Sequence, residues 1–270
     1  SLPVVFTAQV SGNTNGLTFY WDFQNDGTTD VWGGTEARVV TNIFGPGIWS
    51  VLLTASNAAA EGTAKLRTGF ITVGNDAAAY VATDGAHSFP FDTWPTAATN
   101  IQAAIDKIEA ALLAGATSRT VWVGDGRYVL GATLAIGRAL TLQSANGPAG
   151  ALVDGNAAVR CLNLDSGGAI VRGLTFSNGQ GTVTASGVYL TGGMLTNCVV
   201  KSCRSYRAVY ASSGTVVECV ITRNIVGNGG GLQLAGGVAR GCTIIGNSGT
   251  PSGVGVYLSG GVLADSTVVG

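Results

Sequence analysis

Charged residues are scarce in this chain: they make up 11% of its 270 residues, and the formal net charge is -1. Proteins that bind nucleic acid or anionic membranes usually carry a marked excess of positive charge, so this balance gives no electrostatic basis for either partner. The sequence also lacks an uninterrupted apolar run of about 18 residues, which a membrane-spanning helix requires. Disordered segments are usually highly charged and poor in apolar residues. Because 46% of the residues here are hydrophobic, the composition does not indicate disorder.

Histidine is nearly absent, and a leader sequence is not visible. His87 is the one histidine, and beside Ser, Phe and Pro we expect it to be a hydrogen-bonded loop residue rather than a catalytic group. The chain starts at Ser1 without methionine and stops at Gly270 within a repeating pattern. We therefore expect a chain that was processed at its N-terminus, truncated at its C-terminus, or both.

Glycine, by contrast, is abundant, with 42 residues, and much of it belongs to an internal repeat. Four segments align: GVYLTGGMLTNCVV from Gly187, AVYASSGTVVECVI from Ala208, GLQLAGGVARGCTII from Gly231 and GVYLSGGVLADSTVV from Gly255. Each has two short apolar runs around a glycine turn, and none has a run long enough for a helical repeat. Because so short a unit cannot bury its apolar side alone, it must stack on its neighbours. The repeat predicts a parallel β-solenoid with about 4.8 Å between coils, and a related segment from Cys161 extends it backwards.

One outward column of the predicted solenoid is mostly tyrosine. In the first strand of each repeat, apolar residues alternate with a second set on the opposite face of the strand. That outward set is Tyr189, Tyr210, Gln233 and Tyr257. A flat amphipathic stripe of this kind suits contact with a protein partner or a sugar. The alternative is that tyrosine reflects ordinary strand propensity on an exposed face.

Two further columns are predicted to be structural. The first contains Cys198, Cys219 and Cys242. The second contains Asn178, Asn224 and Asn247, with Cys203 interrupting it. We expect the three cysteines to point inward as small apolar fillers, with a disulfide between adjacent coils left open. The asparagines are expected to form an amide ladder along the coil axis. The five cysteines match no zinc pattern and do not decide the compartment.

Residues 1–74 are predicted to form a small β-sandwich. Short alternating strands are separated by Gly, Asn and Pro turns: VVFTAQV, LTFYWDF, ARVVTNIF, WSVLLTASN and GFITV. YWDFQNDGTTD followed by FGPGIWSVLLTASNAAAEGTAK resembles a PKD domain, an immunoglobulin-like extracellular module, although Phe44 stands where that family more usually has a tyrosine. The resemblance implies a core tryptophan and a role as a spacer or as a binder of glycans or proteins.

The same segment contains an oxygen-rich loop. Its polar residues are Asp22, Asn25, Asp26 and Asp30. Oxygen ligands of this kind can hold calcium, although the spacing lacks the regular alternation and terminal Glu of an EF-hand. The alternative is a hairpin in which these side chains form Asx turns. Calcium is the one cofactor that the sequence suggests.

Residues 75–95 are predicted to be a linker and entry segment, and residues 96–270 the β-helix, with its one helix at residues 96–114. Apolar residues recur there at helical spacing, namely Ile101, Ile105, Ile108 and Leu112. Asn100 can cap this helix and Gly115 can end it. Because the end of a solenoid exposes apolar core, we expect the helix to cover the first coil.

A second resemblance covers residues 78–270. The segments DGAHSFPFDTWPTAATNIQAAID, VWVGDGRYVL, LTLQSANGP, DGNAAVRCLNL and GLTFSNG resemble the opening of bacterial right-handed parallel β-helix proteins of the pectin-lyase-like superfamily. GGAI at 167–170 and FSN at 176–178 resemble repeats of large secreted or surface proteins of that kind. The superfamily includes polysaccharide lyases and hydrolases, so the resemblance implies a fold rather than one activity.

An enzyme would need reactive groups close together, and the repeat offers few. From Gly187 onward the acids are Glu218 and Asp265, which share a column two coils apart, or about 10 Å. That separation exceeds the usual range for a glycosidase pair. A lyase would need a basic residue beside a cation, but Asp154 and Asp165 lie several coils from most candidates. The basic residues, expected to be solvated, are Lys201, Arg204, Arg207, Arg223 and Arg240.

The sequence therefore predicts an all-β protein, with an N-terminal immunoglobulin-like β-sandwich and a right-handed parallel β-helix that has one N-terminal capping helix. The function we expect is that of a non-catalytic extracellular or cell-surface bacterial protein, structural or adhesive. Its expected partners are carbohydrate or other protein subunits, including its own copies in an end-to-end filament. The alternative is a polysaccharide lyase or glycoside hydrolase whose active site lies in coils beyond residue 270.

Overall fold

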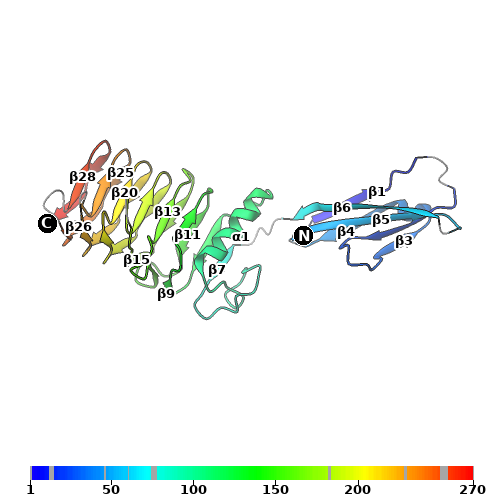
Figure 1. The fold of residues 1–270 in the computed structure, drawn as a ribbon, viewed down its shortest axis with the longest axis horizontal. Coiled ribbons are helices and arrows are strands. Elements are labelled where there is room, and N and C mark those ends of the chain that lie inside the picture. The colour runs from blue at the N-terminus through cyan, green and yellow to red at the C-terminus, as the bar shows by residue number, and fades with distance from the viewer. Residues whose placement is uncertain are drawn as a thin grey trace. The chain divides into compact units, whose positions relative to one another are not determined.

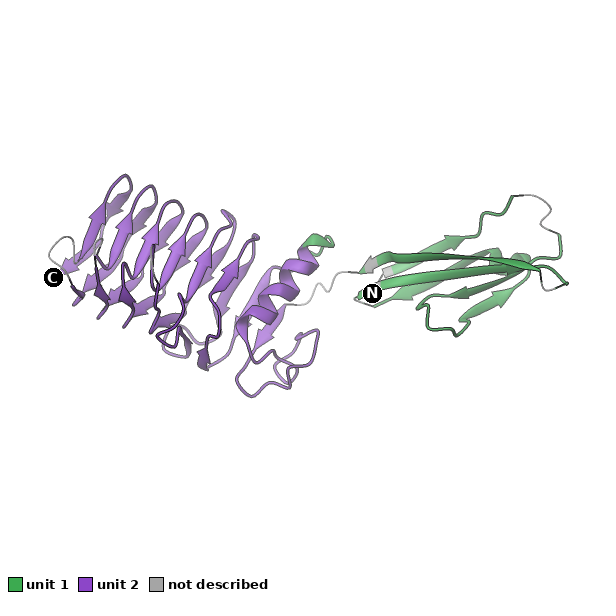
Figure 2. Cartoon of the chain, in the orientation of Figure 1, with its two compact units in different colours: residues 1–76, 113–116 green, residues 77–112, 117–270 purple. Residues whose placement is uncertain are grey.

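The computed structural model describes residues 2–11, 15–45, 47–59, 61–73, 78–181, 184–227, 230–249 and 255–269. The chain divides into two compact units, residues 1–76 with 113–116 and residues 77–112 with 117–270 (Figure 2). Antiparallel sheets form the first unit, and a parallel β-solenoid with one α-helix forms the second (Figure 1). The predicted all-β fold class is confirmed.

Two antiparallel sheets make up the first unit. The smaller sheet pairs β1 (Leu2–Thr7) with β4 (Val39–Phe44). The larger sheet has the order β3 (Val31–Gly33), β2 (Thr18–Asp22), β5 (Gly47–Ser56) and β6 (Gly62–Val73). A short 3-10 helix, η1 (Thr35–Arg38), precedes β4.

An aromatic core joins these two sheets. The ring of Phe6 in β1 lies 5.6 Å from that of Trp21 and 5.1 Å from that of Phe23, measured between centroids. Phe44 in β4 closes the cluster at 6.0 Å from Phe23. The buried indole N–H of Trp21 donates to the carbonyl of Ala37 at 2.8 Å, which satisfies its one polar atom. Because rings from both sheets meet in one core, the unit is a β-sandwich with a core tryptophan.

Three parallel sheets run along the solenoid. The first contains β10 (Leu134–Ile136), β13 (Leu162–Leu164), β16 (Val188–Leu190), β20 (Val209–Ala211), β24 (Leu232–Leu234) and β28 (Val256–Leu258). The second contains β7 (Ala79–Val81), β8 (Thr120–Val123), β11 (Thr141–Ser144), β14 (Ile170–Arg172), β17 (Met194–Thr196), β21 (Thr215–Val217), β25 (Val238–Arg240) and β29 (Val262–Ala264). The third contains β9 (Gly126–Val129), β12 (Ala151–Asp154), β15 (Thr175–Ser177), β18 (Val199–Lys201), β22 (Val220–Thr222), β26 (Thr243–Ile245) and β30 (Thr267–Val269). A small fourth sheet contains β19 (Arg204–Ser205), β23 (Ile225–Val226) and β27 (Ser248–Gly249). The coils make about six turns of the right-handed type, consistent with the predicted β-helix.

The corner between the second and third sheets repeats from coil to coil. One residue there has a positive φ, between 47° and 69°, in each of five coils: Gly173, Asn197, Glu218, Gly241 and Asp265. This left-handed conformation is uncommon outside glycine. It turns the chain so that the next residue, such as Leu174 or Cys198, is buried in the interior. The corner therefore has a similar backbone geometry in each of these five coils.

Helix α1 (Ile101–Leu113) covers the first coil, as predicted. Asn100 caps its N-terminus by accepting the N–H of Ala103 at 2.8 Å. The Gln102 amide accepts the N–H of Ala135 at 2.9 Å and donates to its carbonyl at 3.2 Å, so it satisfies the outer edge of β10. Glu109 accepts the N–H of Gly137 at 2.8 Å. No helix among the described residues is long and apolar enough to cross a membrane.

The segment before the helix contains a strand that the sequence did not indicate. β7 lies within residues 75–95 and pairs in parallel with β8, so it adds one strand to the second sheet. Nearby, His87 accepts the N–H of Thr99 through Nδ1 at 2.9 Å. His87 is thus a hydrogen-bonded loop residue, in agreement with the expectation from its neighbours.

We predict that Ile105→Asp destabilises the solenoid by about 3 kcal/mol or more, because Ile105 is fully buried and the substitution buries an unpaired charge. Thermal unfolding followed by circular dichroism measures the effect. The control is Ala110→Asp, which places the same charge on an exposed position of the same helix. Equal melting temperatures for the two variants would show that the helix does not pack on the core.

Candidate functional site

The tyrosine stripe runs in register along the first sheet. Tyr189 lies opposite Tyr210, Tyr210 opposite Gln233, and Gln233 opposite Tyr257 in successive strands. The rings of Tyr189 and Tyr210 stack, with centroids 5.5 Å apart and 14° between their planes. Gln233 is buried, whereas Tyr257 is 47% exposed. The four side chains share a column, but they do not form one continuous open surface.

Two arginines cover the stacked rings. The guanidinium carbon of Arg160 lies 5.2 Å from the centroid of Tyr189, and that of Arg207 lies 5.2 Å from the centroid of Tyr210. Arg160 is held in place by donating to the carbonyl of Ala185 at 2.8 Å. Each cation–π contact contributes about 0.5–1 kcal/mol at a partly exposed site. Because the ring faces already contact arginine or tyrosine, these side chains offer a ligand mainly their edges and hydroxyl groups.

The asparagine column forms a buried ladder in its upper two coils. The Nδ2 of Asn224 donates to the Oδ1 of Asn247 at 2.9 Å and to the carbonyl of Val200 at 3.0 Å. The Nδ2 of Asn247 donates to the carbonyl of Ile221 at 3.0 Å. Cys203, one coil earlier, donates its N–H to the Oδ1 of Asn224 at 2.9 Å. The amides thus link successive coils through groups that would otherwise be buried without partners.

Asn178 lies one residue before that column and has a different partner. Its Nδ2 donates to the Asp154 carboxylate at 3.0 Å, and Arg127 and the N–H of Asn156 donate to the same carboxylate at 2.7 and 2.8 Å. Burial alone would raise the pKa of Asp154, but the three donors together hold it below its ordinary value. The group therefore stays ionised and crosslinks three successive coils.

The cysteines line the interior. All five are buried, and none is in a disulfide. A hydrogen bond with the Cys198 thiol, together with burial, raises the pKa of Cys219 far above its ordinary value. A hydrogen bond with Cys203, together with burial, does the same for Cys161. These thiols therefore remain protonated and pack as small apolar groups.

In the sandwich, the acidic loop follows β2. The Asp22 carboxylate accepts the N–H groups of Gln24 and Gly27 at 3.2 and 2.9 Å, and the Asp30 carboxylate accepts the N–H of Phe23 at 2.7 Å. Asp26 likewise accepts from within the loop, and Asn25 has a positive φ of 55°. Within the described ranges, no group of three or more His, Cys, Asp or Glu side chains is arranged to hold a metal ion. Calcium binding here stays a prediction.

A shallow groove follows the corner between the second and third sheets. It has a volume of about 390 Å³, and its charged residues are Arg172 and Glu218. The pairing register places Asp265 two coils from Glu218, with Gly241 between them. The groove therefore contains a single carboxylate, whereas acid–base cleavage of a glycosidic bond uses two.

A larger hollow lies at the beginning of the solenoid. It has a volume of about 450 Å³, and the loops after β7, β8 and β11 form it. Its aromatic and polar side chains are Asp84, Trp94, Asp125 and Asn146. Trp94 is 41% exposed. These residues come from three separate segments, so no local sequence motif predicts the hollow. The sequence pattern places Trp94 in the linker and entry segment of residues 75–95.

Close packing fixes the Trp94 ring in this hollow. The ring meets Tyr80 edge to face, with centroids 4.8 Å apart. The ring also lies against Gly124, where an added Cβ would come within 3.0 Å of the indole Cζ3 atom. The hydroxyl of Tyr128 donates to the Gly124 carbonyl at 2.9 Å and fixes the backbone beneath the ring. The Trp94 ring is therefore held against the protein while the side chain stays partly exposed.

The polar wall of the hollow is fixed as well. The Asn146 Nδ2 donates to both carboxylate oxygens of Asp125 at 3.1 Å. Burial, followed by the negative charges of Asp125 and Asp84, raises the pKa of Tyr128 to about 12. Both carboxylates thus raise the pKa of the Tyr128 hydroxyl, which bonds to the backbone of Gly124 next to the Trp94 ring. The hollow combines an aromatic surface with carboxylate acceptors and one amide.

Comparison of the chain with models of known families, with curated proteins and with solved structures gave no match. Function must therefore be argued from the geometry of the two units.

We predict that Asn224→Ala lowers the free energy of unfolding by about 2–4 kcal/mol. The substitution removes the buried hydrogen bonds that the Asn224 side chain makes with Val200, Cys203 and Asn247, each with a net contribution of about 1 kcal/mol. Urea unfolding measures the change. Asn146→Ala, at an exposed asparagine, is the control; a loss of stability as large in the control would contradict the ladder.

Acid unfolding tests the Asp154 crosslink. The pKa of Asp154 is lowered in the folded state, so its contribution to stability is present above the ordinary value of 3.8 and is lost as the pH falls through the lower folded value. We expect Asp154→Asn to be less stable than the parent at neutral pH, with the difference shrinking below about pH 4. Exposed Asp265→Asn is the control. A difference that is independent of pH would refute the assignment.

Proposed function

We propose that this chain is a non-catalytic extracellular surface or matrix protein that adheres to carbohydrate. In this proposal the first unit is a PKD-like spacer, and the second is a β-helix of the pectin-lyase-like type that serves as a stiff scaffold. The observation that carries the proposal is the hollow around Trp94, where an aromatic ring, two carboxylates and an amide converge.

The chemistry of the hollow favours a neutral sugar. An indole face packs against the apolar C–H groups of a pyranose, and carboxylate and amide groups bond to its hydroxyls. The carboxylates of Asp84 and Asp125 would repel the carboxylates of an acidic polysaccharide. The expected ligand is therefore an uncharged hexose within a polymer.

The ladders support the scaffold part of the proposal. Asn224 and Asn247 bond to each other, and the rings of Tyr189 and Tyr210 stack. These side chains connect one coil to the next instead of converging on a reacting centre. Repeated contacts between neighbouring coils stiffen a solenoid along its axis, as a structural protein requires.

End-to-end assembly into filaments remains part of the proposal. Strands that stack coil on coil can also pair with a strand edge of another subunit, and a head-to-tail contact of this kind extends into a filament. Light scattering of the purified chain at increasing concentration tests assembly. Particle mass should rise with concentration if subunits join, whereas a constant monomer mass would count against it.

The competing proposal is a polysaccharide lyase or glycoside hydrolase. The groove that contains Arg172 and Glu218 is the observation that favours it, because a basic and an acidic side chain line the same surface. Assays for unsaturated products and for new reducing ends distinguish the two proposals. Cleavage of any polysaccharide that is lost in Glu218→Gln would replace adhesion by catalysis as the function.

Affinity electrophoresis in gels that contain a neutral β-glucan or a mannan tests carbohydrate adhesion, with polygalacturonate as the acidic comparison. We expect retardation by at least one neutral polymer, and Trp94→Ala should weaken binding at least about tenfold, or about 1.4 kcal/mol. Trp32→Ala is the control, since Trp32 is 70% exposed on the sandwich. Asn146→Ala removes a polar contact without altering the ring, and it should weaken binding as well. Unchanged retardation of the Trp94 and Asn146 variants would refute the site.

A further inference from the structure

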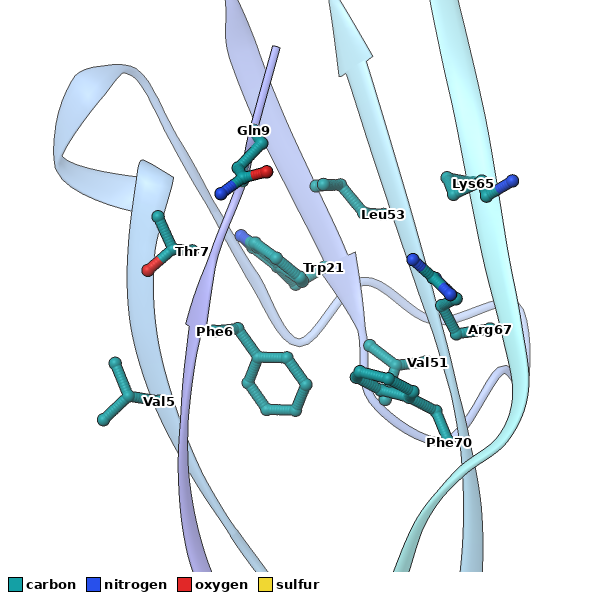
Figure 3. A pocket seen from close by; sticks show the side chains of 11 residues that line it. Val5, Phe6, Thr7, Gln9, Trp21, Val51, Leu53, Lys65, Arg67 and Phe70 are labelled. Atoms are coloured by element: carbon teal, nitrogen blue, oxygen red, sulfur yellow. The ribbon is translucent and has the colours of Figure 1, made fainter.

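The sandwich leaves part of its inner surface uncovered. Its smaller sheet has two strands and its larger sheet has four, so β1 and β4 cannot cover the whole inner face of the larger sheet. A hollow of about 330 Å³ lies beside β1, over β2, β5 and β6. Figure 3 shows Phe6 and Trp21 next to β1, with side chains of β5 and β6 across from them.

The wall of this hollow is a strand edge with open backbone groups. Within the described part of the chain, β1 pairs with β4 alone. The N–H of Ala8 donates to the carbonyl of Arg38, toward β4. Because backbone groups alternate along a strand, the N–H groups of Val5 and Thr7 point toward the other edge. Pro3 falls in the same set, at a position where an edge strand tolerates proline.

The floor and far side of the hollow combine apolar and basic groups. Trp21 and Val51 are buried at the floor, and Leu53 is half-buried beside them. Lys65 and Arg67 from β6 face the same hollow and are exposed. Successive residues on one face of a strand are two apart, as Lys65 and Arg67 are.

We propose that this edge is an acceptor site for an extended peptide strand of a partner protein. The strand pairs with β1 and presents its inward side chains to the hollow. Apolar inward residues cover Trp21, Val51 and Leu53, and inward carboxylates meet Lys65 and Arg67. Backbone pairing supplies affinity, and the alternation of apolar and acidic residues supplies specificity. The proposal concerns the sandwich alone and does not depend on the carbohydrate site of the solenoid.

A strand fits the hollow better than a compact ligand does. A small apolar molecule would cover the floor but would leave the backbone groups of Val5 and Thr7 unpaired. A strand satisfies both features, because it carries backbone donors and acceptors along one edge and side chains at a spacing of two residues. The two cations add charge complementarity with an acidic partner.

The test uses a fluorescent peptide of about nine residues, close to the upper end of usual strand lengths. Threonine occupies its outward positions, and valine alternates with glutamate at its inward positions. A comparison peptide carries lysine in place of glutamate. Fluorescence anisotropy with the full chain measures binding, and hydrogen exchange measures protection of the Val5 and Thr7 amides. We expect the glutamate peptide to bind at least about tenfold more tightly than the lysine peptide and to protect both amides.

Protein variants separate charge from backbone pairing. The double variant Lys65→Glu with Arg67→Glu should reverse the preference between the two peptides. Val5→Pro removes an edge N–H and should weaken binding of the glutamate peptide at least about tenfold. Val5→Ala keeps that N–H and is the matched control, since Val5 is 65% exposed; its affinity should stay within about threefold of the parent.

Three outcomes would overturn the proposal. The first is no binding of the glutamate peptide by a chain that keeps the parent circular dichroism spectrum, in which case Lys65 and Arg67 serve only to keep other strands away from β6. The second is binding without protection of Val5 and Thr7, which would indicate a contact other than strand pairing. The third is binding that is indifferent to charge reversal at Lys65 and Arg67.

Discussion

Backbone pairing between successive coils is the interaction on which the solenoid depends. Every strand of the three long sheets bonds to the equivalent strand one coil earlier or later. A shift of one residue in any coil would move its buried residues to the surface, since the two faces of a strand alternate. The corner residues with left-handed backbone conformation, among them Asn197, Glu218 and Asp265, give each coil the same turn and so maintain the strand register. Register thus determines both the interior and the surface.

Stacking in register brings identical side chains together, and their chemistry then decides what each column does. Amides satisfy one another and nearby carbonyls, as Asn224 and Asn247 do. The rings of Tyr189 and Tyr210 stack on each other and contact arginine side chains, so contacts within the protein occupy their faces. The thiols of Cys161 and Cys219, whose pKa values are raised, remain protonated in the interior. Groups that would be reactive in isolation therefore serve stability, and surfaces open to ligands occur where the repeat is interrupted.

Edges are the second constraint. A strand with one partner leaves a row of backbone groups unpaired along its other edge. The edges in this protein differ in whether another segment satisfies those groups. At β10 the helix residue Gln102 satisfies Ala135 through both amide atoms. At β1 the described chain supplies no second neighbour, and the hollow beside it is apolar with two cations on its far side. The loops that close the start of the solenoid form the hollow around Trp94. One candidate binding surface thus lies where the repeated coils begin, and the other lies at an open strand edge of the sandwich.

The sequence by itself determined the repeated part of this protein, because a period of two within strands and coils of similar length are visible as local patterns. It indicated the solenoid, the capping helix with Ile105 inside, and the coincidence of Tyr189 with Tyr210. It placed Asn178 in the amide column, whereas the structure puts it one residue earlier, bonded to Asp154, since coil lengths vary by a few residues. Only the tertiary structure decided the hollow around Trp94, the burial of Gln233 and the open edge of β1. Each depends on contacts between segments that are distant in sequence, and such contacts cannot be predicted from a local periodicity.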